Sequence, residues 1–245
     1  MSTQHMFING DILEGNYYTE NSSGPSDEDA RKIVWRAHEI WRYAASQVSA
    51  DSDEFKLSDA ISNLKRAVNH RLQALNQAYS FDALPFANRK QTLEKLQFYG
   101  IIRPTIVKEL FEVRNLIEHQ DGRPPGIEHC KRYVDFVWYF LKSTDSLLLM
   151  KVIDVIFWKD EEHDVSLDCQ PEFDGSWNIT VVGNLPDEYI LDRMQSGAVE
   201  LDCTIDRPAY VRAPIYGRWN PTPEQLTTFA RKYFELSGYS WEDHA

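Results

Sequence analysis

Three residues near position 115 have side chains suited to acid–base and phosphate chemistry. Arg114, Asn115 and His119 lie close together in a stretch whose apolar residues recur at helical spacing. Residues four apart share one face of a helix, so Asn115 and His119 point to the same side. Arg114 is turned by about 140° from His119 and reaches the same edge through its long side chain. Histidine titrates near neutral pH and guanidinium groups pair with phosphate oxygens, so this trio predicts a site for phosphate chemistry.

The pattern Arg114-Asn115-x-x-x-His119 resembles the R-polar-x3-H signature of the HEPN superfamily. Residues 60–75, AISNLKRAVNHRLQAL, resemble the long second helix of such domains. The resemblance covers about residues 27–150 and none of residues 151–245. It implies a helical bundle of a kind that often acts as a metal-independent ribonuclease in toxin–antitoxin and antiviral systems. It also implies a homodimer in which two copies of the motif face one cleft.

The resemblance implies a role for each residue of the trio in a hydrolase. It also implies that this hydrolase uses neither a metal nor a cofactor. His119 would act as the general base that takes the proton of a ribose 2′-OH. Arg114 would stabilise the charge of the transition state, and Asn115 would orient His119 or hold the phosphate. RNA would then be cut to products with a 2′,3′-cyclic phosphate, and DNA would not be cut.

Two other interpretations of the trio stay open. In the first, the run is structural: Arg114 pairs with Glu112 or Glu118, and the Asn and His side chains bond locally. In the second, the domain is a non-catalytic, HEPN-like dimeric scaffold that binds a nucleotide or a protein partner. The sequence favours the endoribonuclease over both.

Charge is divided unevenly along the chain, whose net charge is −12. Residues 27–150 carry 18 basic and 17 acidic residues, whereas residues 151–245 carry 8 and 18. RNA binding needs local positive potential, so the first part is the place for it. The candidates for a basic rim are Lys65, Arg66, Arg71 and Arg123, although a solvated helix face would look the same. The acidic part is expected to recognise a regulator or antitoxin, to sense a trigger or to restrain the nuclease.

The residue pattern predicts an α+β fold in two modules. Residues 1–26 look like an irregular leader. An all-α bundle of about five helices follows over residues 27–150, with apolar residues repeating at three- and four-residue steps. The helices are expected at about residues 27–47, 54–79, 88–99, 104–120 and 127–148. A small, acidic α+β domain follows over residues 151–245, with strands near residues 151–158, 175–182 and 197–205 and a helix over residues 223–236.

Composition excludes several classes of protein. The 42% of hydrophobic residues is too high for a disordered chain. An uninterrupted run of about 18 apolar residues is missing, which argues against a membrane partner and a transmembrane helix. The three cysteines are far apart, so neither a disulfide framework nor a cysteine zinc site is expected. The acidic run at residues 160–164 is typical of a polar turn rather than of a metal site. We therefore expect a cytoplasmic protein without a metal.

Overall fold

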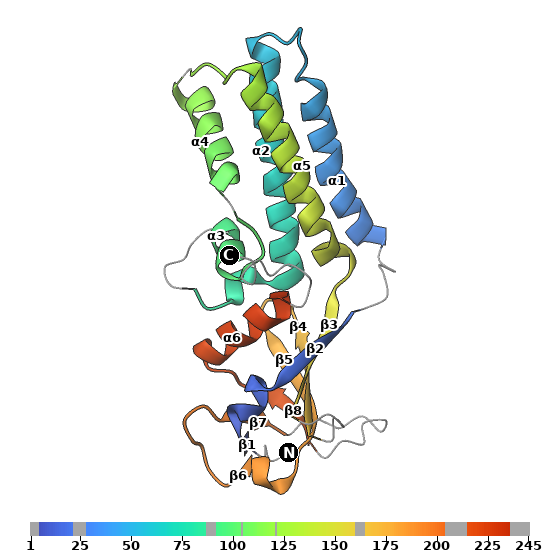
Figure 1. Cartoon of the computed structure of the whole chain (residues 1–245), viewed down its shortest axis with the longest axis vertical. Helices are drawn as coiled ribbons and strands as arrows, with labels where there is room; N and C mark the ends of the chain where they lie inside the picture. The colour runs from blue at the N-terminus through green and yellow to red at the C-terminus, as the bar shows by residue number, and fades with distance from the viewer. Residues whose placement is uncertain are drawn as a thin grey trace. The chain divides into compact units, whose positions relative to one another are not determined.

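Helices and strands occupy different parts of the chain in the computed structural model, which gives an α+β fold (Figure 1). The structure describes residues 5–21, 28–86, 92–103, 105–120, 122–159, 165–203 and 215–235. The chain divides into two compact units. We call the unit that contains helices α1–α5 the helical unit, and the unit that contains strands β1–β8 and helix α6 the sheet unit.

The helical unit is built around three long helices that pack against one another: α1 (Glu28–Ser46), α2 (Glu54–Tyr79) and α5 (Ile127–Leu149). Helix α4 (Thr105–Gln120) packs on α2 and α5, and the short α3 (Thr92–Phe98) contacts α2. Figure 1 shows α1, α2 and α5 running side by side, with α4 beside them. Among the described residues, no helix combines the length and the apolar character needed to span a membrane.

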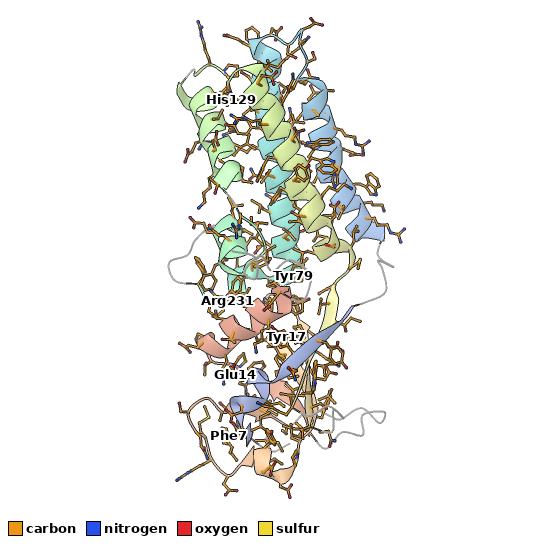
Figure 2. All side chains as sticks on the ribbon, viewed as in Figure 1. Phe7, Glu14, Tyr17, Tyr79, His129 and Arg231 are labelled. Carbon is orange, nitrogen blue, oxygen red and sulfur yellow. The ribbon has the colours of Figure 1, made fainter. Side chains whose placement is uncertain are left out.

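Helix α2 begins and ends at residues suited to those places. The Asp53 side chain accepts a hydrogen bond from the Lys56 amide at 2.8 Å, which satisfies a free donor of the first turn. The helix ends at Ser80, which takes a left-handed conformation with φ of 46°. The side chain of Tyr79 points toward the end of α5, where its hydroxyl donates to the Leu147 carbonyl (Figure 2). These contacts fix the helix that forms one wall of the site described below.

The sheet unit contains one eight-stranded sheet with the order β2-β3-β4-β5-β8-β7-β1-β6. Every neighbouring pair is antiparallel. The strands are β1 (His5–Ile8), β2 (Asn16–Asn21), β3 (Val152–Trp158), β4 (Ser166–Glu172), β5 (Asn178–Asn184), β6 (Ile190–Leu191), β7 (Val199–Asp202) and β8 (Ile215–Trp219).

Helix α6 (Pro223–Phe234) packs on this sheet through an aromatic core. It opens with a capping box in which Thr222 and Gln225 bond reciprocally. The Phe229 ring lies 5.5 Å from the Trp219 ring and 6.3 Å from the Phe157 ring, measured between centroids. The first pair is edge-on and the second is tilted, and such aromatic pairs add stabilisation beyond the area they bury.

The first residues of the chain differ from the expected irregular leader. Within residues 5–21, β1 pairs with β7 and β2 pairs with β3, so the N-terminal segment contributes two strands to the sheet. Tyr17 stands opposite Phe157 in the β2–β3 pair. The partners come from more than a hundred residues further along the chain, which explains why local pattern gave no sign of these strands. The two units divide between Lys151 and Val152, where the residue pattern also changes.

Replacing Gly10 by alanine is expected to destabilise the sheet unit. A Cβ atom at Gly10 would fall on the carbonyl oxygen of Gly197, which is backbone and cannot rotate away. We expect a loss of about 1–3 kcal/mol in the free energy of unfolding, measured by urea titration of buried tryptophan fluorescence. Gly126→Ala is the control, because no atom lies within 4 Å of the Cβ position there. Equal urea midpoints for Gly10→Ala and the parent would contradict the close approach.

Candidate nucleic-acid interface

A polar groove lies between helices α2 and α4 of the helical unit. Four turns of α2 present side chains to it at three- and four-residue steps, and α4 contributes Arg114. The cavity has a volume of about 420 Å³. Its lining residues are Ser62, Lys65, Arg66, Asn69, His70, Gln73 and Arg114.

A second cavity of about 240 Å³ adjoins the first one. The two cavities share Asn69 and Gln73, and the second continues along α2 as far as Asn76. Phe111 on α4 and Leu93 on α3 supply its apolar wall. The groove therefore runs lengthwise along α2, with a basic end and an apolar end.

Lys65 connects the two helices across the basic end. Its ammonium group donates to Oδ1 of Asn115 at 3.2 Å and lies 5.2 Å from the centre of the Phe111 ring. Burial lowers the pKa of Lys65, and the positive charge of Arg114 lowers it further. The structure thus brings Lys65, Arg114 and Asn115, all three predicted as site residues, to one place.

Basic side chains line the groove. Lys65, Arg66 and Arg114 line it, and none of the described residues that line it is an aspartate or a glutamate. A cavity lined by one sign of charge concentrates oppositely charged ligands.

His119 lies in the last turn of α4, but its side chain is outside the described residues, as are those of Leu116 and Glu118. On helix geometry it belongs to the face of Asn115, one turn further toward the end of α4. The expected use of His119 as a base remains a prediction.

The expected basic rim needs correction at Arg71. This side chain is 0% exposed, and its guanidinium donates to the Leu141 carbonyl, the Thr144 hydroxyl and an Asp145 carboxylate oxygen, each at 2.8 Å. Arg71 links α2 to α5, and its fully buried side chain cannot contact RNA. Arg123 is exposed and lies 3.7 Å from Glu54, among residues that do not line the groove.

Among the described residues that line the groove, His70 is the one histidine, and sequence analysis did not select it as a site residue. Burial is the main cause that lowers its pKa, and the positive charges of Arg36, Arg71 and Arg66 add to the effect. The imidazole is therefore neutral at pH 7, and its buried Nδ1 makes no hydrogen bond within the described residues. A neutral imidazole in a basic groove can accept a proton. The signal in the sequence was the spacing of Lys65, Arg66 and His70, which places all three on neighbouring turns of α2.

The lowered pKa of His70 predicts a pH-dependent stability. The unfolded chain takes up a proton on this histidine near pH 6.5, whereas the folded chain resists it to lower pH. The free energy of unfolding therefore rises with pH between the pKa of His70 in the folded chain and its pKa in the unfolded chain. Acidification through this pH range destabilises the helical unit. We expect His70→Gln to reduce the fall in the thermal midpoint between about pH 7 and pH 5.

The exposed His129 on α5 provides the matched control for this measurement. Replacing His129 by glutamine should leave the fall in the thermal midpoint as it is in the parent. Equal pH dependence in His70→Gln and the parent would mean that His70 protonates alike in the folded and unfolded chain.

Metal ligands do not gather in the parts of the chain that the structure describes. Within those ranges no three His, Cys, Asp or Glu side chains form a group able to hold an ion. The acidic run at residues 160–164 lies outside the described residues.

Comparison of the chain with models of protein families, with curated proteins and with solved structures finds no match to any of the three.

Proposed function

We propose that the helical unit binds RNA in the α2–α4 groove and cleaves it as a metal-independent endonuclease of the HEPN type. The observation that carries this proposal is the groove itself. Three cations, Lys65, Arg66 and Arg114, line one cavity together with a neutral imidazole, and Lys65 contacts Asn115 directly. The three cations suit the binding of a phosphodiester, and the base in the proposal is His119, in the last turn of α4 beyond Asn115.

The shape of the groove supports a single-stranded ligand. Its basic end can pair with phosphates, while Asn69 and Gln73, shared by both cavities, offer amide donors and acceptors to sugars or base edges. Phe111, at the apolar end, offers an aromatic side chain against which a base can pack. A double helix presents its phosphates on a much wider surface than a groove between two helices.

The chemistry needs no group beyond this chain and the RNA. His119 takes the proton of the ribose 2′-OH, whose oxygen attacks the neighbouring phosphorus. The bond from phosphorus to the 5′-oxygen of the next nucleotide breaks, and that oxygen leaves as a hydroxyl by taking the proton that His119 had removed from the 2′-OH. Arg114 neutralises the negative charge that develops on the phosphoryl oxygens. The products are a 2′,3′-cyclic phosphate and a free 5′-hydroxyl.

The wider setting follows the same resemblance. We propose that helices α1–α5 form the five-helix HEPN-like bundle, that it acts as a homodimer, and that the protein works in the cytoplasm in a toxin–antitoxin or antiviral role. Residues 151–245 have a net charge of −10. This charge suits the recognition of a basic regulator or antitoxin.

Cleavage is tested by incubating the purified full chain with a mixed RNA pool in EDTA. We expect fragments that end in 2′,3′-cyclic phosphate, none with the His119→Ala variant and none from single-stranded DNA. DNA lacks the 2′-OH nucleophile, so cleavage of DNA would overturn the mechanism. RNA that is bound but not cut would favour the non-catalytic scaffold instead.

Binding is tested separately with the double variant Lys65→Gln/Arg66→Gln. Loss of two phosphate contacts should weaken RNA binding and lower the slope of log K against log salt by about 1.4. The matched control is Lys131→Gln/Arg132→Gln, an adjacent pair of exposed cations on α5. If both double variants lose affinity equally, RNA is attracted by overall charge and the groove is not its site.

A further inference from the structure

A second cavity of the helical unit lies between α1 and α5, and none of its lining residues belongs to the RNA groove. Its volume is about 390 Å³, within the range of small-molecule sites. Side chains that recur at helical steps on each helix line it: Arg31, Val34, Trp35, His38, Trp41 and Arg42 from α1, and Trp138, Lys142, Asp145 and Leu149 from α5.

Three tryptophans give this cavity flat aromatic walls. The indole of Trp41 is fixed in place because its Nε1 donates to the Val134 carbonyl at 2.8 Å. Trp138 packs edge-on against Tyr139 with 4.9 Å between ring centroids. Trp35 remains 60% exposed, which is unusual for the largest apolar side chain. Indole rings that line a cavity are suited to stacking on another planar ring.

Positive charge surrounds these walls. Arg31, Arg42 and Lys142 line the cavity, and the Arg42 guanidinium lies 5.9 Å from the centre of the Trp35 ring. Asp145 is the only carboxylate among the described lining residues. It accepts hydrogen bonds from Arg71 at 2.8 Å and from His38 at 3.0 Å, and its Oδ2 lies 3.7 Å from the Lys142 ammonium group. The cavity therefore offers net positive charge to a ligand.

A rigid floor lies beneath the walls. His38 is only 8% exposed, and Arg71 is fully buried behind Asp145. The bonded row His38–Asp145–Arg71 joins α1, α5 and α2, so the two walls of the cavity are held at a fixed separation. A cavity held open in this way does not collapse when it is empty, which lowers the cost of binding.

We propose that the α1–α5 cavity binds a nucleotide, with its base stacked on Trp35 and Trp138 and its phosphate beside Arg42 and Lys142. The tryptophan walls favour a planar aromatic ring, and the basic side chains favour an anionic group. The ligand class that satisfies both is an aromatic ring that bears an anionic group. The nucleotide is either a free mononucleotide or the end of an RNA strand, and both present the same base and phosphate. This inference does not depend on RNA cleavage in the α2–α4 groove.

The test is calorimetric titration of the full chain with four kinds of ligand: nucleoside 5′-monophosphates, nucleosides, ribose 5-phosphate and a short oligoribonucleotide. We expect the monophosphates to bind at concentrations below about 1 mM and both half-ligands to bind at least about tenfold more weakly. A preference for the oligoribonucleotide that Trp35→Ala abolishes would identify an RNA end as the ligand of this cavity, and a preference for the monophosphate that Trp35→Ala abolishes would identify a free nucleotide.

Two variants and their matched controls place the ligand in this cavity. Trp35→Ala and Arg42→Gln should each weaken monophosphate binding by about tenfold. Tyr43→Ala and Arg36→Gln change residues of the same helix that are exposed but do not line the cavity, and they should leave binding within about twofold of the parent. Absence of binding at about 1 mM, or equal losses in the variants and their controls, would overturn the proposal.

Discussion

Replacing Arg114 by alanine is expected to lower the rate of RNA cleavage by about 100- to 1,000-fold, the usual cost of removing one charge-stabilising donor from a transition state. Arg114 is the only residue of α4 that lines the basic end of the groove, among the described residues. Its charge lies near enough to Lys65 to lower the pKa of that lysine. The measurement is single-turnover cleavage of a labelled oligoribonucleotide in EDTA, with protein in excess, so that the chemical step is observed apart from binding.

Two further variants serve as a conservative replacement and as a control for this measurement. Arg114→Lys keeps the charge but loses the planar, two-pronged donor, so it should recover only part of the rate. Lys108→Ala removes an exposed cation from the same helix outside the groove and should cleave at the parental rate. If Arg114→Ala cleaves as fast as the parent, Arg114 has no part in the reaction, and the assigned motif fails with it.

The long helices could be predicted because their own residues specify them. The periodic apolar face of residues 54–79 predicts α2, whose bounds agree with the expectation. Strands β1 and β2 could not be predicted in the same way. Each is short, and each acquires its partner from a distant segment, β7 or β3, which no local pattern can reveal.

The candidate site shows the same division between local and distant information. Lys65, Arg114 and Asn115 could be selected by residue type and helical spacing, but the contact between Lys65 and Asn115 spans fifty positions. For Arg71, the prediction from local sequence was wrong. Its place beside Lys65 and Arg66 in the sequence suggested a common surface, whereas a carboxylate 74 positions away draws it into the core.

The pair of Arg71 and Asp145 leads to the largest expected effect on stability. Asp145→Ala would leave a fully buried guanidinium without a counter-charge, although two neutral oxygens would still accept its hydrogen bonds. Burial lowers the pKa of Arg71, and Asp145 opposes that effect. The carboxylate therefore stabilises the buried positive charge of Arg71. We expect the free energy of unfolding of the helical unit to fall by about 3–5 kcal/mol. The measurement is a urea titration followed by helical circular dichroism.

The cause of that loss can be separated from loss of packing by two further variants. Asp135→Ala makes the same change at an exposed position of α5 and should shift the free energy by less than about 0.5 kcal/mol. The double variant Arg71→Met/Asp145→Leu removes the charge together with its partner and should recover most of the stability, because apolar groups of similar size can replace a buried ion pair. His38 then loses its acceptor, so the recovery is expected to be incomplete. If the double variant is no more stable than Asp145→Ala, the stranded charge is not the cause, and the hydrogen bonds that Asp145 makes to α1 and α2 are what hold the three helices together.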